Sequence, residues 1–540
     1  MQNSDTTWHL PAGRRRTGRI VLSAFCILHF AFLGCAKQPP ATTPSAPAPS
    51  APAAPPAPAA PAPPVAPSEP VPPKPDPLAD LRRDILAATN SPGVQRGVWG
   101  VIVHSLDKNE RLFEFNPRLL LVPASTAKIV TVAAAADTVG WNYRYRTTLR
   151  ATGQTTGGVL RGDLVAVGSG DPSVGGPAGD DLSVWVARLK AAGIRRIEGR
   201  IVGDDDAIEE PRPQLAWAWD DLGYVTGAVF GALNVAENRT TITISPGKTE
   251  TAPTTISVDP RAAYRTLTNR SVTGPAGSIQ LLWPEQRPGE TSLTIGGSIP
   301  VGNPPVTIGI AVGNPTLWFA NVLRNRLIRD GIEVTGEAAD IDDIRPPPAS
   351  ANATVVYTHQ SRTLAEIAKP LLKDSINLYA EALLRLNAAP GAFPTNDAAL
   401  EGLRMRLDAW GVPRDSYQLV DGSGLSRRST VTPDTLLAVL QRMHDPSGVS
   451  PFVSGLPIAG VDGSLASRMK GTPAENNLRA KTGTMSNIRT MAGYVTTRDG
   501  ERVALVIMIN NFEGIGTQAN AAIDRIAVSV AAFSRDALAR

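Results

Sequence analysis

The chain of 540 residues has only two cysteines, Cys26 and Cys35, and both lie in its first 35 residues. The globular part therefore has no cysteine pair for a disulfide, and its stability must come from buried apolar side chains. Histidine is also scarce, because beyond the N-terminal segment only His104, His359 and His444 occur. None of these stands in a G-x-S-x-G or H-E-x-x-H context, which disfavours a Ser-His-Asp triad and a zinc peptidase. We expect no metal and no organic cofactor.

A large net charge and a long hydrophobic run are missing as well. Lys and Arg number 53 against 49 Asp and Glu, and four of the arginines lie in the first 19 residues, so nothing indicates a nucleic-acid partner. The apolar run at 20–34 is about 15 residues long, shorter than the ~20 that a membrane-spanning helix needs. Residues 1–35 therefore fit a signal peptide, and we expect an exported protein of the periplasm or cell envelope.

The end of this segment, "FLGC", resembles the lipobox of bacterial lipoproteins, although Phe32 and Leu33 depart from its usual residues. The resemblance implies that Cys35 is lipidated and anchors the protein to a membrane. Ordinary secretion with cleavage nearby is the alternative. Residues 36–77 are almost entirely Pro, Ala, Ser and Thr, with too little apolar bulk to fold. We expect a disordered, semi-stiff linker there.

Folding is expected to begin with a helix over 76–88, which Asp76 caps and Pro77 starts. The apolar face of this helix is predicted to comprise Leu78, Leu81, Ile85 and Leu86. Two strand-like runs, at 97–106 and 111–116, follow and flank a polar turn, which predicts a hairpin.

Between residues 149 and 350 the sequence changes to short strand-like runs broken by Gly, Pro and Asn, which indicates inserted β-rich domains. The runs lie at 162–170, 240–247, 292–300 and 306–313. Afterwards helical patterns return at 363–374, 377–388, 398–411 and 432–444, then strands at 487–497 and 503–512 and a helix from about Thr517. We expect one α/β domain built from residues 78–148 and 351–540, with 149–350 inserted.

The pattern S-x-x-K occurs four times, so its context must decide which copy matters. The copies are Ser105/Lys108, Ser125/Lys128, Ser245/Lys248 and Ser467/Lys470. The first falls where a strand enters a turn, and the third contains Pro and Gly. The fourth is interpreted as the exposed face of a short helix. In the second, Pro123 is well placed to start a helix, so Ser125 and Lys128 lie one turn apart on one face. The helix dipole there favours the negative charge of an attacking alkoxide.

Lys128 can act as a base only if its pKa is lowered, which burial and a second cation nearby would do. Lys481 supplies this cation within the single K-T-G of the chain, on a strand-like segment. Gly483 would let a substrate approach the strand edge, and Thr484 offers a main-chain N–H.

A third motif, Ser375-x-Asn377, stands at the junction of two helical patterns. Its hydroxyl can relay a proton, and its amide can hold a substrate carbonyl. A second S-x-N, at Ser350 and Asn352, follows three prolines and is interpreted as a loop.

S-x-x-K, S-x-N and K-T-G in this order are the signature of the penicillin-recognising acyl-serine transferases. From about residue 79 to the end, stretches such as "GDLVAVGSGDPS", "VDGSGLSRRSTVTP" and "LRAKTGTMSNIRTMAGYV" resemble the class C low-molecular-mass penicillin-binding proteins, the D-alanyl-D-alanine carboxypeptidase/endopeptidase family. The resemblance implies a penicillin-binding transpeptidase-like (serine β-lactamase-like) α/β fold, with an antiparallel sheet flanked by helices and inserted β-rich domains.

The same resemblance implies the site residues. It assigns catalysis to Ser125, Lys128, Ser375, Asn377 and Lys481 and substrate binding to Thr482, Gly483, Thr484 and Asp221. The N–H groups of Ser125 and Thr484 would form the oxyanion hole. Asp221 follows "WAWD" and would recognise the side-chain end of a stem peptide, although the adjacent Asp220 and a solvated turn are alternatives.

Two other polar clusters are interpreted as structural. Asp204 to Asp206 are expected to form a solvated turn rather than a metal site, and Ser423 and Ser426 to shape a turn near the site. The expected function is that of a serine D,D-peptidase of peptidoglycan that β-lactams inhibit. A serine β-lactamase and a catalytically silent, lipid-tethered cell-wall-binding protein are the alternatives.

Overall fold

The computed structural model describes residues 76–536, except for 178, 180, 211, 212, 215, 260–265, 288–291 and 350–352. The predicted signal peptide with Cys35, nearly all of the predicted linker and the S-x-N copy at 350–352 lie outside the described residues. None of the helices that the structure describes is long and apolar enough to cross a membrane.

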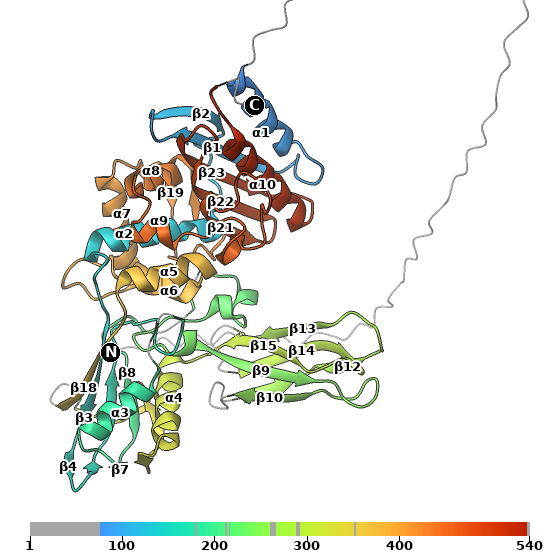
Figure 1. The fold of residues 1–540 in the computed structure, drawn as a ribbon. Helices are drawn as coiled ribbons and strands as arrows, with labels where there is room; N and C mark the ends of the chain where they lie inside the picture. The colour runs from blue at the N-terminus through green and yellow to red at the C-terminus, as the bar shows by residue number, and fades with distance from the viewer. Residues whose placement is uncertain are drawn as a thin grey trace, which may run out of the picture. The chain divides into compact units, whose positions relative to one another are not determined.

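Five antiparallel strands form the sheet that carries the K-T-G motif. Their order is β2 (Glu110–Phe115), β1 (Val98–Ser105), β23 (Arg502–Asn510), β22 (Ile488–Thr496) and β21 (Arg479–Met485). Segments from opposite ends of the chain thus lie side by side, and β23 is the central strand (Figure 1). The predicted hairpin and the two predicted C-terminal strands are confirmed.

Successive side chains of a strand point to opposite sides of the sheet. Both faces of this sheet are buried, because each packs against helices. The odd-numbered residues 503–509 of β23 pack against the side of α1 (Pro77–Thr89) and α10 (Gly516–Ala532). The even-numbered residues 504–508 share a core with the helices of the other face. These helices are α2 (Ala127–Val139), α5 (Leu364–Asp374), α6 (Asn377–Arg385), α7 (Asn396–Ala409), α8 (Pro433–Met443) and α9 (Pro451–Gly455). The antiparallel sheet flanked by helices is therefore as predicted.

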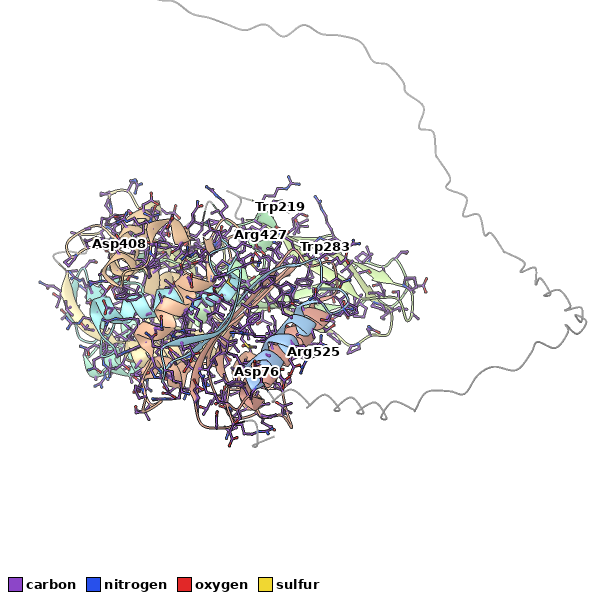
Figure 2. All side chains as sticks on the ribbon, turned by 90° about the horizontal axis from the view of Figure 1, so that it is seen from above. Asp76, Trp219, Trp283, Asp408, Arg427 and Arg525 are labelled. Carbon is purple, nitrogen blue, oxygen red and sulfur yellow. The ribbon has the colours of Figure 1, made fainter. Side chains whose placement is uncertain are left out.

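Helix α1 begins as the sequence predicts. The Asp76 carboxylate, labelled in Figure 2, accepts hydrogen bonds from the N–H groups of Leu78 and Ala79, both at 3.1 Å. Leu86 was wrongly predicted to lie on the buried face, because it is 42% exposed. The buried face of the helix instead comprises Leu81, Ile85, Ala88 and Thr89.

Residues 146–360 form four further sheets. The first has the order β17 (Ala338–Asp340), β8 (Ile201–Asp204), β6 (Leu164–Val167), β3 (Arg146–Ala151) and β18 (Thr354–Gln360). The second has the order β16 (Glu333–Val334), β7 (Arg196–Ile197), β5 (Val159–Arg161) and β4 (Gln154–Thr156). The chain enters this region along β3 and leaves it along β18, and these two strands pair antiparallel.

The remaining two sheets hold most of the strands that the sequence predicts for this region. One has the order β10 (Thr255–Asp259), β9 (Arg239–Ser245) and β15 (Val306–Ala311). The other has the order β11 (Thr266–Asn269), β14 (Ser292–Pro300) and β12 (Val272–Gly274), with β13 (Leu281–Glu285) paired to β14. The four predicted runs are confirmed as β6, β9, β14 and β15.

Two helices of this region were not predicted. They are α3 (Ser183–Ala191) and α4 (Pro315–Arg329), which bury Trp185, Trp318 and Phe319 in a common core. The region is therefore less purely β than its short apolar runs indicate.

Candidate active site

Ser125 lies in a short 3₁₀ turn, η1 (Ala124–Thr126), that leads directly into α2. The carbonyl of Pro123 fixes this turn, because it accepts hydrogen bonds from the hydroxyls of Thr126 (2.7 Å) and Thr490 on β22 (2.8 Å). The helix thus begins where the proline predicts, and the serine stands at its N-terminal end.

The residue before this proline is tied to the central strand. The amide oxygen of Asn510, at the end of β23, accepts from the main-chain N–H of Val122 at 2.8 Å, and its Nδ2 donates to the carbonyl of Val122 at 3.2 Å. The loop that carries Ser125 is therefore held by two elements of the main sheet.

Lys128 is fully buried and has three polar partners. Its Nζ donates to Asn377 Oδ1 (2.6 Å) and to the carbonyl of Ser423 (2.8 Å), and it lies 2.7 Å from Ser125 Oγ. The first two partners can only accept, whereas a hydroxyl can also donate. A neutral amine has two N–H groups and one lone pair, so it satisfies all three contacts with the lone pair facing the O–H of Ser125.

Burial also favours this neutral form. It lowers the pKa of Lys128 to about 7, although the nearby carboxylates of Asp421 and Glu381 act in the opposite direction. Burial lowers the pKa of Lys481 well below its usual value, and the charge of Lys128 lowers it further. Burial is thus the main cause for both lysines, and repulsion from the other ammonium group adds to it for Lys481.

Lys481 joins the K-T-G strand to the S-x-N motif. Its Nζ donates to Ser375 Oγ at 2.9 Å and to the carbonyl of Thr482 at 2.8 Å. Ser375 follows the last residue of α5 and has a φ of 63°, in the left-handed region. A residue other than glycine in this region costs on the order of 1 kcal/mol, and such strain is commonly found where a side chain must be aimed.

Asn377 is engaged at both ends of its amide. Besides accepting from Lys128, it donates through Nδ2 to the carbonyl of Thr226, at 2.8 Å, in the 3₁₀ turn η3 (Val225–Gly227). The sequence predicts that this amide holds a substrate carbonyl, but here it joins the lysine to the 146–360 region.

The K-T-G motif lies on β21, as predicted. The Thr482 hydroxyl pairs with that of Ser464 at 2.6 Å, and Thr484 is exposed. A Cβ at Gly483 would lie 2.1 Å from Thr490 Oγ1 and 2.8 Å from the carbonyl of Pro123. The glycine therefore permits close packing of β21 on β22 and on the turn before Ser125, a role that the sequence did not predict.

The sequence profile of the D-Ala-D-Ala carboxypeptidase 3 (S13) family matches residues 81–532. The chain belongs to this family. It is 32% identical over 469 residues to a D-alanyl-D-alanine carboxypeptidase of Actinomadura sp. (strain R39), an alignment that covers 85% of each chain. The predicted D-alanyl-D-alanine carboxypeptidase activity and the predicted family are confirmed.

Solved structures agree with this assignment. Penicillin binding protein 4 from Haemophilus influenzae superposes with a TM-score of 0.71 at 25% identity, covering 83% of this chain and 97% of the other. A complex of the same protein with a β-lactam superposes with a TM-score of 0.66 at 23% identity, covering 82% and 97%. The penicillin-binding transpeptidase-like fold is therefore confirmed.

In this S13 enzyme a segment of the 146–360 region lies against the loop that carries Ser423. Trp217 Nε1 donates to Asp421 Oδ2 at 3.0 Å, and the Ser426 hydroxyl donates to the carbonyl of Ala216 at 2.8 Å. The Ser423 hydroxyl donates to the same Asp421 oxygen at 3.3 Å. The two serines thus shape a turn beside the site, as predicted.

The candidate recognition residues follow this contact in the 3₁₀ turn η2 (Trp219–Asp221). Trp219 projects from the ribbon and is 59% exposed (Figure 2). Asp220 is exposed, whereas Asp221 is half-buried. Burial and the charge of Asp220 raise the pKa of Asp221, and the guanidinium of Arg427 lowers it. Asp221 therefore lies within the electrostatic reach of the loop beside the site.

Sequence reasoning missed two acids and one carbonyl next to Lys128: Asp421, Glu381 and the main-chain oxygen of Ser423. A carbonyl has no sequence signature, and Asp421 stands in a Gly- and Ser-rich stretch typical of a turn. Glu381 has a weak signal, because it is an acid in a helix that is otherwise apolar around most of its surface.

The prediction of a solvated turn at 204–206 is wrong for two of the three residues. Asp204 and Asp205 are buried, and burial raises the pKa of Asp205 to about 7. One carboxylate oxygen each of Asp205, Glu210 and Asp342 lie within 4.8 Å of one another, a spacing that suits a metal ion. Burial and the neighbouring Asp342 also raise the pKa of Glu210, to about 6, which favours a shared proton here.

Proposed function

We propose that this D-alanyl-D-alanine carboxypeptidase acts on peptidoglycan stem peptides through an acyl-enzyme on Ser125. The observation that carries the proposal is the buried amine of Lys128, 2.7 Å from Ser125 Oγ, with a pKa lowered to about 7. Its other two hydrogen-bond partners are carbonyl oxygens, so its lone pair is left for the proton of the serine.

In the first half-reaction, Ser125 Oγ attacks the carbonyl between the two D-alanines while Lys128 takes the hydroxyl proton. The N–H groups of Ser125 and Thr484 stabilise the oxyanion. The C–N bond then breaks, and the terminal D-alanine leaves with a proton returned from Lys128, with the Ser375 hydroxyl as relay. Water hydrolyses the resulting ester and regenerates Ser125. If the leaving amine belongs to a neighbouring stem, the same steps cleave a cross-link.

The remaining site residues bind the substrate. Lys481 and the hydroxyls of Thr482 and Thr484 hold the C-terminal carboxylate, because hydrogen-bond donors gathered on one strand beside a lysine suit an anion. Gly483 contributes indirectly, because its missing side chain lets β21 pack closely on β22 and on the turn before Ser125. Asp221 contacts the amino end of the stem side chain, a role that its partial burial favours over that of the exposed Asp220.

The chain divides into a catalytic domain and inserted domains. The sequence predicts boundaries at 148 and 350, but β3 and β18 pair with each other, so we place the catalytic domain at 78–145 and 361–540 and the inserted domains, which complete the site, at 146–360. The relatives named above support export, which the predicted signal peptide at 1–35 would direct, and a linker at 36–77 would give the enzyme reach within the cell envelope.

We further propose that Cys35 carries a lipid anchor. Cys35→Ser is expected to move the protein from the membrane fraction to the soluble fraction, measured by fractionation and immunoblotting. A mutant that stays firmly in the membrane fraction, or a mature N-terminus well away from Cys35, would contradict the anchor.

Penicillin labelling tests the nucleophile. Intact-protein mass spectrometry should show one penicillin equivalent, which peptide mapping should place on Ser125. Ser125→Ala should abolish labelling and stay folded, whereas Ser467→Ala, in an exposed turn, should label normally. Persistent labelling of Ser125→Ala would refute the assignment. Rapid turnover without a lasting adduct would instead favour β-lactam hydrolysis.

Product analysis on purified peptidoglycan tests the substrate. Release of free D-alanine measures carboxypeptidase action, and conversion of cross-linked dimers to monomers measures endopeptidase action. We expect both products from the wild-type enzyme and neither from Ser125→Ala. Intact peptidoglycan after incubation with an enzyme that penicillin labels would refute the proposed substrate.

A further inference from the structure

A buried carboxylate lies behind the catalytic lysine. Glu381 is on α6, one turn after Asn377, and its side chain is 0% exposed. Its Oε1 accepts the N–H groups of Ser423 (2.9 Å) and Gly422 (3.1 Å), and its Oε2 lies 3.2 Å from the same Gly422 nitrogen. The carbonyl of Ser423 accepts from Lys128 Nζ at 2.8 Å. One residue of the loop thus links Glu381 to the lysine.

We propose that Glu381 is a positioning residue for the reaction at Ser125. Glu381 holds the carbonyl of Ser423 against Lys128, and its charge acts on the ammonium form of Lys128. This inference rests on the proposed role of Lys128 as the base. No group of Glu381 touches Ser125 in the contacts above, so its influence passes through the lysine.

The hydrogen bonds make the positioning specific. A neutral amine at Lys128 has only two N–H groups, and each needs an acceptor if the lone pair is to face the hydroxyl of Ser125. Asn377 supplies one acceptor and Ser423 the other. If residues 422–423 shift, the amine loses one acceptor and is free to rotate its lone pair away from Ser125.

The charged neighbours of Glu381 come from three elements. Lys128 lies on α2, Asp421 on the loop, and Arg385 one turn further along α6. Burial and Asp421 raise the pKa of Glu381 to about 7, and Arg385 opposes this. Lys128 in turn faces Glu381, Asp421 and Lys481.

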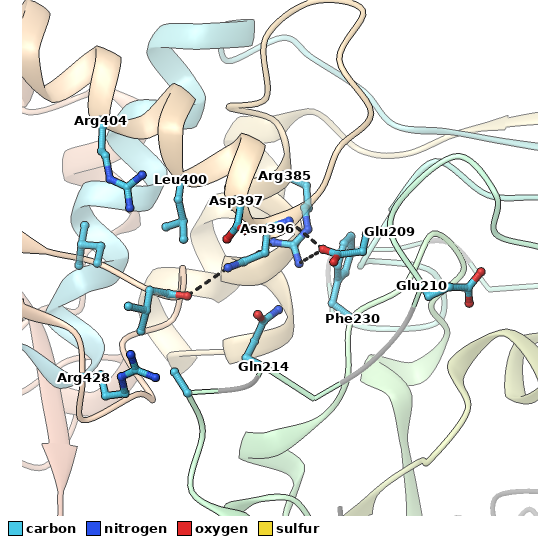
Figure 3. Close-up of a pocket in the computed structure, with 13 residues that line it drawn as sticks. Glu209, Glu210, Gln214, Phe230, Arg385, Asn396, Asp397, Leu400, Arg404 and Arg428 are labelled. Atoms are coloured by element: carbon cyan, nitrogen blue, oxygen red, sulfur yellow. Dashed lines mark hydrogen bonds and ion pairs between the residues drawn. The ribbon is translucent and has the colours of Figure 1, made fainter. Parts of the chain in front are cut away.

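The arginine is itself fixed. Arg385 donates to Asn396 Oδ1 at 2.9 Å and lies 4.0 Å from a carboxylate oxygen of Glu209, beside a cavity of about 260 Å³ (Figure 3). Its side chain also packs over the ring of Phe230, 5.8 Å from the ring centroid. The positive charge beside Glu381 is therefore held by Asn396 of α7 and by Glu209 and Phe230 of the 146–360 region.

The sign of the electrostatic effect follows from these charges. An ionised Glu381 stabilises the ammonium form of Lys128 and so raises its pKa against the effect of burial. Without this charge the lysine loses its proton at a lower pH. The acidic limb of the pH profile for acylation should then move to lower pH.

Two substitutions separate the effect of the charge of Glu381 from the effect of its position. The measurement is the rate of acylation by a fluorescent penicillin from pH 5 to 9, on the full chain. Glu381→Gln keeps an oxygen for the two N–H groups and removes the charge. We expect its acidic limb to move down by about half a pH unit, because a carboxyl with a pKa of about 7 is only partly ionised where Lys128 titrates. Glu381→Asp keeps the charge but withdraws the carboxylate from the loop. We expect a loss of tenfold or more in acylation rate with the acidic limb unchanged.

The matched control is Glu401→Gln on the exposed surface of α7, which should leave both the rate and the limb at wild-type values. If the acidic limb of the Glu381→Gln pH profile lay at the same pH as that of the wild type, the proposed electrostatic effect on Lys128 would be overturned. A Glu381→Asp rate equal to that of the wild type would overturn the positioning part, and this result stands even if the Gln variant fails to fold. A wild-type enzyme that penicillin does not label on Ser125 would instead refute the proposed function.

Discussion

A lysine whose usual pKa lies near 10 serves as a base near neutral pH only if its surroundings penalise the charged form. Lys128 meets this condition through complete burial, and its three partners suit the amine better than the ammonium ion. An ammonium ion would have to place one N–H toward Ser125, and it would then offer no lone pair to the nucleophile.

The acylation rate should therefore depend on pH with a midpoint near 7. Below this pH Lys128 is increasingly protonated and the rate should fall about tenfold per pH unit, whereas above it the rate should level off. The measurement is the second-order rate constant for penicillin labelling from pH 5 to 9. Circular dichroism at each pH controls for unfolding, and a flat profile in folded enzyme would contradict Lys128 as the base.

At this scale the sequence predicts side chains that follow one another closely and misses contacts between distant segments. Ser125 and Lys128 lie one turn apart in a helix, so their proximity follows from helix geometry alone. The acceptors of the lysine lie on other elements, and one of them is a main-chain carbonyl that any residue type carries.

Among the elements, α5 ends in a conformation that a serine adopts at a cost. Ser375 has a φ of 63°, a position where glycine is the usual residue at a helix C-terminus. The strained backbone aims the hydroxyl at Lys481, 2.9 Å away. The conformation of this helix terminus therefore lowers the stability of the fold but places the hydroxyl oxygen of Ser375 beside Lys481.

Ser375→Gly should relieve the strain and remove the oxygen. We expect the free energy of unfolding to stay level or rise by up to about 1 kcal/mol, while the acylation rate falls about 10²-fold or more. Ser375→Ala is the matched control, since it also lacks the hydroxyl but keeps the strain, so it should be the less stable of the two. Denaturant titration and penicillin labelling measure both effects, and near-normal acylation of either variant would remove Ser375 from the reaction.

The predictable elements are those whose apolar period is regular and whose ends carry caps. Helices α5, α7 and α8 combine a 3.6-residue period with a capping threonine, and α6 has the period without a side-chain cap. The positions of all four were predicted to within a few residues. Helix α4 also has a cap, Asn314, and Pro315 in its first turn. It was missed because Gly313 and Asn314 end a strand-like run and resemble a turn, and because Trp318 and Phe319 favour strands.

For the molecule as a whole, the 146–360 region is joined to the catalytic centre by specific hydrogen bonds. Thr226 accepts from Asn377, and Trp217 donates to Asp421, whose carboxylate also holds the turn around Ser423. Asp421 is 1% exposed, and its Oδ2 also accepts from the N–H of Ser426 at 2.8 Å, so Trp217 supplies one of three hydrogen bonds to an oxygen that water reaches poorly. The inserted region therefore supports the same turn that positions Lys128.

Trp217→Phe removes this donor while keeping an aromatic ring. A lost hydrogen bond to a buried carboxylate costs about 1.5–3 kcal/mol, and we expect the looser turn to lower the acylation rate about 10-fold or more. Trp283→Phe, on β13 of the same region and 40% exposed, is the matched control and should acylate normally (Figure 2). Equal rates for both variants and the wild type would show that the contact does not support the site.

The bond between Val122 and Asn510 has a consequence for synthesis of the enzyme. These two residues are 388 positions apart, so the nascent chain carries the serine loop for roughly 20–80 s before its anchor emerges from the ribosome. The central strand of the sheet arrives in the same late stretch, since β23 spans Arg502–Asn510. A ribosomal product that stops before this strand would contain Ser125, Lys128 and Lys481 and still lack the frame that aligns them. Only the completed chain is therefore expected to hydrolyse peptides, because fragments released before β23 is made lack the strand that aligns these residues.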